Sequence, residues 1–311
     1  MKAYLIRRII HSLFAVFGVL LVVFLLVRLT PGDPALLLLP DLAPPDAVVA
    51  LRKELGLDRS IFIQFWIFLQ HVVRGNLGQS IFFRQDALKL VFQALPTTIF
   101  LTSGSFLIAL IISIPVGVIS ATKRYSIYDY LTLVGVLLGQ SMPTFWLGIM
   151  LILFFAVIWH IFPTSGPGGW KHYVLPCLSL STYMVALVTR LTRSGMLEIL
   201  NEDYVRTARA KGLSERVVIG RHALLNTMVQ IVTVLGLQIG TLLGGAVITE
   251  KVFALPGVGT LIIKAIELRD YPVVQASVLV TALLFVLINF LVDILYLYID
   301  PRISYVSPEE R

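Results

Sequence analysis

Six apolar stretches, each long enough to cross a lipid bilayer, constrain this chain more than any other feature of its sequence. A transmembrane helix needs about 20 consecutive, mostly apolar residues, and its backbone groups must be hydrogen-bonded within the segment because lipid offers no partners. The sequence therefore predicts an all-α polytopic membrane protein with six transmembrane helices. The stretches cover roughly residues 9–29, 97–121, 131–159, 174–193, 228–249 and 273–299.

The composition supports this class. Of the 311 residues, 57% are apolar and 14% are charged, whereas soluble domains are about 45–50% apolar and about 25% charged. The first apolar stretch follows Lys2, Arg7 and Arg8 like a secretory signal. It is too long for one and ends without a small-residue cleavage site, so we interpret it as a retained span.

The distribution of basic residues predicts the orientation. If the N-terminus is cytoplasmic, the inside segments 1–8, 122–130, 194–227 and 300–311, with Arg190 and Arg193, hold fourteen Lys and Arg residues. The outside segments are longer in total and hold ten. Basic residues concentrate in cytoplasmic loops, so both termini are expected in the cytoplasm.

The same loops explain a net charge of +7. No basic run alternates with aromatic residues on a polar domain, which argues against a nucleic-acid-binding protein.

Cys177 is the one cysteine and lies within an apolar stretch. It has no partner for an intramolecular disulfide and no metal-ligand spacing, so we expect a small buried side chain.

The segment 30–96 is predicted to be a structured extracytoplasmic loop. Pro45 and Gly56 are suited to begin and end one helix, and Ser60 is suited to begin a second with an apolar face. The segment Gly75-Asn-Leu-Gly78 indicates a turn. The loop either covers the outer surface or docks an extracytoplasmic partner, and both roles are compatible.

A second loop, 250–272, is amphipathic and either dips into the outer interface or closes over a pathway mouth.

The sequence contains no motif for nucleotide or hydrolytic chemistry. A P-loop requires Gly-x-x-x-x-Gly-Lys-Ser/Thr, and no lysine here is followed by Ser or Thr. Neither Gly-x-Ser-x-Gly nor His-Glu-x-x-His occurs. We therefore expect no catalytic residues, no metal site and no cofactor in this chain; any ATP must be bound by another chain.

The longest inside loop contains a predicted charged helix near residues 201–212. Asn201 is suited to cap its N-terminus, and Gly212 is suited to the left-handed position after its C-terminus. A small face formed by Thr207 and Ala208 is suited to enter a groove on a partner. The alternative is a solvated loop helix with no partner.

At this segment the sequence resembles a known family, the permease subunits of binding-protein-dependent ABC importers. The resemblance is greatest to the dipeptide, oligopeptide, glutathione and nickel branch, and to the first permease of each pair. It extends in order along nearly the whole chain. The strings that carry it are Leu29-Thr-Pro-Gly-Asp-Pro-Ala35, Leu55-Gly-Leu-Asp58, Gly75-Asn-Leu-Gly-Gln-Ser80, Ser141-Met-Pro-Thr-Phe-Trp-Leu-Gly148, His172-Tyr-Val-Leu-Pro176, Asp203-Tyr-Val-Arg-Thr-Ala-Arg-Ala-Lys-Gly-Leu-Ser-Glu-Arg216, Glu250-Lys-Val-Phe-Ala-Leu-Pro-Gly-Val-Gly259, Arg269-Asp-Tyr-Pro272 and Asn289-Phe-Leu-Val-Asp293.

The resemblance implies a type I ABC importer fold in a bacterial inner membrane. It implies a heterodimer with a second permease, two cytoplasmic ATPases that bind ATP and Mg²⁺, and an extracytoplasmic solute-binding protein. The chain would be a single permease domain, 1–311, with a five-helix transport core at 97–299 and a coupling loop at 194–227. The residues implied to contact an ATPase are Asp203, Tyr204, Arg206, Thr207, Ala208, Arg209, Ala210, Lys211 and Gly212.

One departure from the general family motif occurs in that loop. Most ABC importers have Glu-Ala-Ala six residues before the glycine, where this chain has Arg206, Thr207 and Ala208. The peptide branch itself diverges there, so coupling is still expected.

Several small or polar residues lie at or near membrane depth. Gly236, Gly240 and Gly244 recur every four residues, which favours close helix packing, a subunit interface or a pathway wall. Polar groups at this depth are candidates for function or for bonding between helices; they are Gln238, Asn289 and Asp293.

Two other classes of protein compete with the importer subunit. A self-sufficient secondary carrier or channel usually has several buried charges or an inverted repeat, and neither is evident here. The second competing class is an assembly or receptor scaffold that does not transport. The substrate stays open among dipeptides, oligopeptides, glutathione and nickel.

Overall fold

The computed structural model describes residues 2–29, 44–54 and 58–299 of the chain. They form helices joined by turns, with no strand beyond one isolated bridge between Gln79 and Asp86. Contacts divide the chain into two compact units, each described by itself. The core unit contains residues 96–260 and those from 287 on, and the outer unit contains residues 2–95 and 261–286. The strings at 29–35 and 55–58 and the segment 300–311 lie largely outside the described residues.

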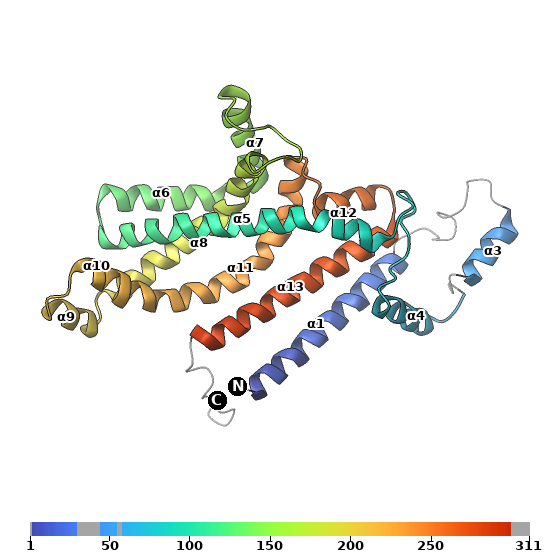
Figure 1. Cartoon of the computed structure of the whole chain (residues 1–311), viewed down its shortest axis with the longest axis horizontal. Coiled ribbons are helices and arrows are strands. Elements are labelled where there is room, and N and C mark those ends of the chain that lie inside the picture. Colours follow the sequence, from blue (N-terminus) through green and yellow to red (C-terminus); the bar gives the residue numbers. More distant parts are fainter. Residues whose placement is uncertain (1, 30–43, 55–57, 300–311) are drawn as a thin grey trace. The chain divides into compact units, whose positions relative to one another are not determined.

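The predicted helical class is confirmed. Five helices are long and apolar enough to cross a membrane: α1 (Lys2–Leu29), α5 (Ala87–Thr122), α8 (Lys171–Ile199), α11 (Leu225–Val252, preceded by a short segment from Glu215) and α13 (Tyr271–Ile299). A bent pair of shorter helices passes the same test when taken together and is a sixth candidate span. All these helices appear in Figure 1.

The bent pair corrects the prediction of one continuous span over 131–159. α6 (Ile127–Ser141) ends before Pro143, and α7 (Thr144–Leu151) continues into a π-helical segment, η1 (Ile152–Ile158), at an angle of 108° to α6. Met142 is extended (φ −85°, ψ 128°), as expected for a residue before proline. Because the proline ring excludes helical backbone at Met142, the helix breaks there.

In the core unit, α8 is the central element. It packs against α6, α7 and α11, and its buried residues include Leu180, Met184 and Val188. These join one apolar cluster with Leu235 and Leu242 of α11. A helix surrounded by other helices hides its polar groups as well: Thr192, 0% exposed, donates its hydroxyl hydrogen to the Val188 carbonyl, 2.8 Å away.

In the outer unit, the two predicted helices of segment 30–96 are present as α3 (Pro45–Glu54) and α4 (Ile61–Val73). Ser60 precedes α4 as expected, although its side chain makes no capping hydrogen bond. Phe65 and Phe68 of α4 pack on Phe24 of α1, with ring centroids 5.2 and 5.7 Å away. The apolar face of α4 therefore covers α1.

The turn that follows α4 is fixed by a buried carboxylate. Asp270, which is fully buried, accepts hydrogen bonds from the Ser80 hydroxyl and from the backbone N–H groups of Ile81 and Phe82. Gly75 and Gly78 have φ of +70° and +88°, which confirms the predicted turn. The amphipathic segment 250–272 contains α12 (Val258–Glu267), and Asp270 closes the turn between α12 and α13.

Candidate functional site

The predicted charged helix is present between α8 and α11. It is α9 (Asp203–Ala210), followed by α10 (Glu215–Val217) and a π-helical segment, η2 (Val218–Leu224), that leads into α11. Figure 1 shows α9 and α10 at the end of the core unit where the turn between α5 and α6 lies. Two of the most basic loops of the sequence therefore meet at one end of this unit.

The C-terminus of α9 is closed as the sequence predicts. Gly212 has φ +80°, a conformation that glycine adopts without a Cβ penalty. The Gly212 N–H donates to the Arg209 carbonyl (2.9 Å), and the Leu213 N–H donates to the Ala208 carbonyl (3.3 Å). This pair of bonds is a Schellman motif, which fixes the point where α9 ends.

The predicted N-cap is wrong by one residue. Glu202, with extended backbone, occupies the N-cap position, and its side chain makes no capping bond. The Asn201 amide instead donates to the Leu197 carbonyl, 2.8 Å away, at the end of α8. Because α8 ends only three residues before α9 begins, its unpaired carbonyl groups compete for the Asn201 side chain.

The prediction that Ala208 faces a partner is also wrong. Val205 and Ala208 are 0% and 6% exposed and form a small core with Val218, against Ile199 and Leu200. These contacts hold α9 against the end of α8 and the start of η2. Ala208 thus belongs to the support of the helix rather than to its free surface.

Two polar contacts strengthen that support. The Arg209 guanidinium donates to the Glu215 carboxylate at 2.7 Å, and the Asn226 amide donates to the Tyr204 hydroxyl at 3.1 Å. The first joins α9 to α10 and the second joins α9 to α11.

The opposite face of α9 is exposed. Helical periodicity places Asp203, Arg206, Thr207 and Ala210 on one side, away from Val205, and all four are exposed. Arg206 lies 3.4 Å from the Asp203 carboxylate, and Thr207 donates its hydroxyl hydrogen to the Asp203 carbonyl at 2.9 Å. Lys211 and Gly212 extend this exposed surface. Ala210, not Ala208, is the small residue that it presents.

A buried ion pair supports the same end of the unit, and sequence analysis missed it. Arg193 of α8 donates to both carboxylate oxygens of Asp129, at 2.7 and 2.9 Å. Asp129 lies in the first turn of α6, is 2% exposed, and also accepts from the Ser120 hydroxyl and the Tyr125 N–H. The signal was available: Ser126-Ile-Tyr-Asp129 matches a capping box, whereas Arg193 had been counted only as a loop charge.

Another buried carboxylate lies near the C-terminal end of α11. Glu250, which is fully buried, accepts from the Thr98 hydroxyl of α5 at 2.6 Å and from the Thr260 N–H of α12 at 3.1 Å. The Thr98 oxygen in turn accepts from the Val258 N–H at 2.9 Å. A carboxylate at a helix N-terminus satisfies N–H groups that lack intrahelical partners. Glu250 thereby joins α5, α11 and the start of α12.

Removing this carboxylate should destabilise the subunit. In Glu250→Ala, the Thr98 hydroxyl and the Thr260 N–H lose their acceptor, at a cost of about 1–3 kcal/mol for each buried group. We expect a lower melting temperature of the purified subunit in detergent. Glu198→Ala is a matched control, since Glu198 is exposed on α8. Equal melting temperatures for the two variants would show that the network contributes nothing.

The three spaced glycines of α11 do not act alike. A Cβ on Gly236 would lie 2.2 Å from Val292 of α13, whereas one on Gly244 would meet nothing within 4 Å. Gly240 is half-buried and Gly244 is exposed. Gly236 therefore permits close helix packing within the subunit. Gly244 lies on a surface that other chains or the pathway can use.

The predicted polar groups at membrane depth lie on two helices, Gln238 on α11 and Asn289 and Asp293 on α13. Gln238 is half-buried and accepts from the Thr241 hydroxyl at 2.8 Å. Asn289 is half-buried in α13. The backbone of Asp293 is helical, but its side chain falls outside the described residues. Among the described residues, no group of three or more His, Cys, Asp or Glu side chains is placed to hold a metal ion.

Comparison with known proteins identifies relatives along the whole chain. Residues 113–305 match the family described as the inner membrane component of binding-protein-dependent transport systems, and residues 1–102 match the family of its N-terminal part. The chain is 41% identical over 305 residues to the glutathione transport system permease protein GsiC of Escherichia coli strain K12, covering 98% of this chain and 100% of that protein.

Two further comparisons agree. The chain is 39% identical over 333 aligned residues to the dipeptide transport system permease protein DppB of Alkalihalophilus pseudofirmus, again covering 98% of this chain and 100% of the relative. Among solved structures, an inward-facing MetNI methionine ABC transporter matches with a TM-score of 0.55 and 20% identity, covering 68% of this chain and 96% of the other. That likeness extends to the fold alone.

Proposed function

The chain belongs to the family of inner membrane components of binding-protein-dependent transport systems, and we propose that it forms half of a translocation pathway driven by partner ATPases. Family members are multi-pass permease subunits of ABC importers, and they transport rather than catalyse. The whole chain, residues 1–311, is proposed to act as one permease domain. Its partners are a second permease, two ATPases that bind ATP and Mg²⁺, and an extracytoplasmic solute-binding protein.

The observation that carries this proposal is the construction of α9. The helix has a buried face that is fixed to α8 and η2, and an exposed face that extends from Asp203 to Ala210. A short helix presented so rigidly outside the apolar spans is suited to insert into a groove of another protein. We propose that this exposed face contacts an ATPase, and that residues 203–212 form the coupling segment.

The proposed orientation follows from charge. The turn between α5 and α6 carries Lys123 and Arg124, and the α9 segment carries Arg206, Arg209 and Lys211. Both lie at one end of the core unit (Figure 1). Basic residues favour the cytoplasmic side, so we place this end inside. With an even number of spans, both termini then lie in the cytoplasm.

The proposed substrate is a small peptide-like solute, a dipeptide, oligopeptide or glutathione. This rests on the relatives, one named for glutathione transport and one for dipeptide transport. In such systems the separate binding protein would do most of the selecting, so a nickel-type substrate is an outcome that the experiment below must distinguish.

Purification from the native membrane tests the assembly. The tagged chain should retain a second permease and two copies of P-loop ATPase in mild detergent, and liposomes with this complex should take up labelled peptide only with ATP and binding protein. Adding glutathione or nickel as competitor identifies the substrate class. A homomer of this chain that transports without ATPases would overturn the proposal in favour of a secondary carrier.

A further inference from the structure

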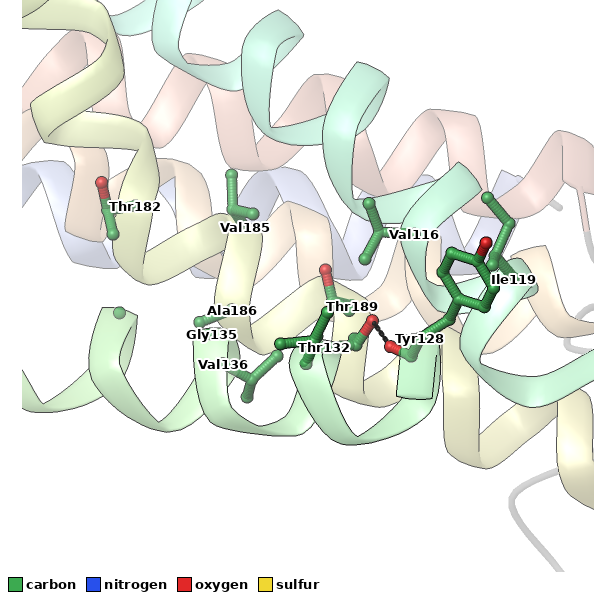
Figure 2. Close-up of a pocket in the computed structure, with 12 residues that line it drawn as sticks. Val116, Ile119, Tyr128, Thr132, Gly135, Val136, Thr182, Val185, Ala186 and Thr189 are labelled. Carbon is green, nitrogen blue, oxygen red and sulfur yellow. Dashed lines mark hydrogen bonds between the residues drawn. The ribbon is translucent and has the colours of Figure 1, made fainter. Parts of the chain in front are cut away.

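The core unit contains a hollow of about 450 Å³ between α5, α6 and α8, shown in Figure 2. Its volume lies within the range of roughly 300–1,000 Å³ that is typical of small-molecule sites. Small residues leave the space open: Gly135 and Ala186 line it, and a Cβ on Gly135 would meet nothing within 4 Å. The remaining walls are mainly aliphatic, as Val116, Val136 and Val185 in Figure 2 illustrate.

One polar group in this hollow lacks a partner. Thr189 is 1% exposed and lines the cavity, and its hydroxyl makes no hydrogen bond to any of the described residues. The two other threonines of the lining donate to their own helices, Thr132 to the Tyr128 carbonyl and Thr182 to the Leu178 carbonyl, both at 2.8 Å. A buried hydroxyl without a hydrogen-bond partner is unfavourable. The unpaired Thr189 hydroxyl therefore indicates that the hollow holds a molecule with a hydrogen-bond acceptor.

The mouth of the hollow is basic and aromatic. Tyr128 lines it, and the Lys123 ammonium lies 4.6 Å from the centre of the Tyr128 ring. Arg124 lies next in sequence and stacks on Tyr125, with its guanidinium 4.5 Å from that ring. Both tyrosines are more than half exposed. Exposed tyrosines and cations at the end of a span characterise the level of lipid headgroups, and clustered cations there attract anionic lipids.

The depth of Thr189 fits this arrangement. Thr189 lies four residues before Arg193 in α8. Arg193 binds Asp129 beside the basic turn. Four residues of α-helix correspond to about 6 Å along the axis. Thr189 therefore lies about one helical turn below the cations, where the ester carbonyl of a phospholipid would lie below its phosphate.

We propose that this hollow binds one anionic phospholipid. An acyl chain occupies the apolar cavity, the ester carbonyl accepts a hydrogen bond from Thr189, and Lys123 and Arg124 hold the phosphate. Charge complementarity at the mouth and the unpaired hydroxyl favour a lipid over a helix of another chain. The site is separate from the exposed face of α9, the proposed contact with an ATPase.

Native mass spectrometry of the purified transporter complex tests the proposal. Dioleoyl-phosphatidylglycerol and dioleoyl-phosphatidylcholine are added in equal amounts, so that the two lipids differ only in headgroup. The wild-type complex should retain one phosphatidylglycerol, preferred by about fivefold for each contributing cation. Gly135→Leu should abolish this retention because the new side chain fills the cavity. Gly18→Leu is the matched control in α1, where a Cβ would also meet nothing within 4 Å.

Two further variants separate headgroup from chain. Lys123→Gln with Arg124→Gln should retain a lipid but bind the two headgroups equally. Thr189→Val, nearly isosteric, should weaken retention of both lipids without unfolding the subunit, which keeps the test valid if Gly135→Leu fails to fold. Equal lipid retention by Thr189→Val and wild type would overturn the proposal. So would a chemical cross-link from the thiol of Gly135→Cys to the second permease, because that chain would then occupy the hollow.

Discussion

Replacing Ala210 by glutamate should uncouple ATP hydrolysis from uptake while the subunit still inserts and folds. Ala210 is the small residue of the exposed face of α9, at the C-terminal end of the helix, and the variant places a larger, charged side chain there. Coupling between two sites typically corresponds to about 1–3 kcal/mol, or roughly 5–150-fold. We expect uptake in liposomes to fall by at least about tenfold. Basal ATPase activity should persist, without stimulation by the loaded binding protein.

Two controls separate coupling from folding. Ala50→Glu introduces the same charge at an exposed position of α3 and should leave uptake unchanged. Ala208→Glu buries a carboxylate between Val205 and Val218, so it should lower the melting temperature and the yield of the subunit. If Ala210→Glu behaved like Ala50→Glu in uptake and in ATPase stimulation, the exposed face of α9 would not be the contact with the ATPase.

The features that could be predicted from the sequence are those set by local patterns. Long apolar stretches locate the spans because lipid excludes unpaired backbone groups. Gly212 could be assigned its left-handed conformation because a single residue type is favoured there. The turn at Gly75–Gly78 was predictable for the same reason.

Two of the three incorrect predictions, for Asn201 and Ala208, failed because a neighbouring helical segment contacts the residue in question. Asn201 has the right side chain for an N-cap, yet the end of α8 binds it first. Ala208 was predicted to lie with Thr207 on a small face suited to enter a partner's groove, but it is buried against Val218, ten residues later. Met142-Pro143 marked a break that the apolar count over 131–159 concealed. For Asn201 and Ala208 the deciding contact comes from a neighbouring segment. At Met142 the following proline is itself a local signal, which the count of apolar residues ignored.

The buried pair of Asp129 and Arg193 is the extreme example, since 64 residues separate its members. In addition to Arg193, Asp129 is hydrogen-bonded to Ser120 near the end of α5 and to Tyr125 and Ser126 in the turn between α5 and α6. This pair ties the start of α6 to the part of α8 that precedes α9. The Asp129–Arg193 pair thus connects α6 to the segment that carries the proposed contact with the ATPase.

Removing one member of this pair should therefore be strongly destabilising. The side chains of Arg193 and Asp129 are 20% and 3% exposed, and deleting one partner of a buried pair costs about 3–5 kcal/mol because the other charge stays buried and unpaired. We expect Arg193→Ala and Asp129→Ala each to lower the melting temperature of the purified subunit clearly.

The exposed pair of α9 provides the matched control. Asp203 and Arg206 are 95% and 69% exposed, and such surface pairs contribute about 0–1 kcal/mol. Asp203→Ala should therefore leave the melting temperature nearly unchanged.

Asp129→Leu with Arg193→Met should recover part of the loss, since no charge stays buried. The recovery is incomplete because the Ser120 hydroxyl and the Tyr125 N–H still lack their acceptor. Equal melting temperatures for Asp129→Ala and Asp203→Ala would contradict this role, and a stabilised double variant would show that the pair serves geometry rather than stability.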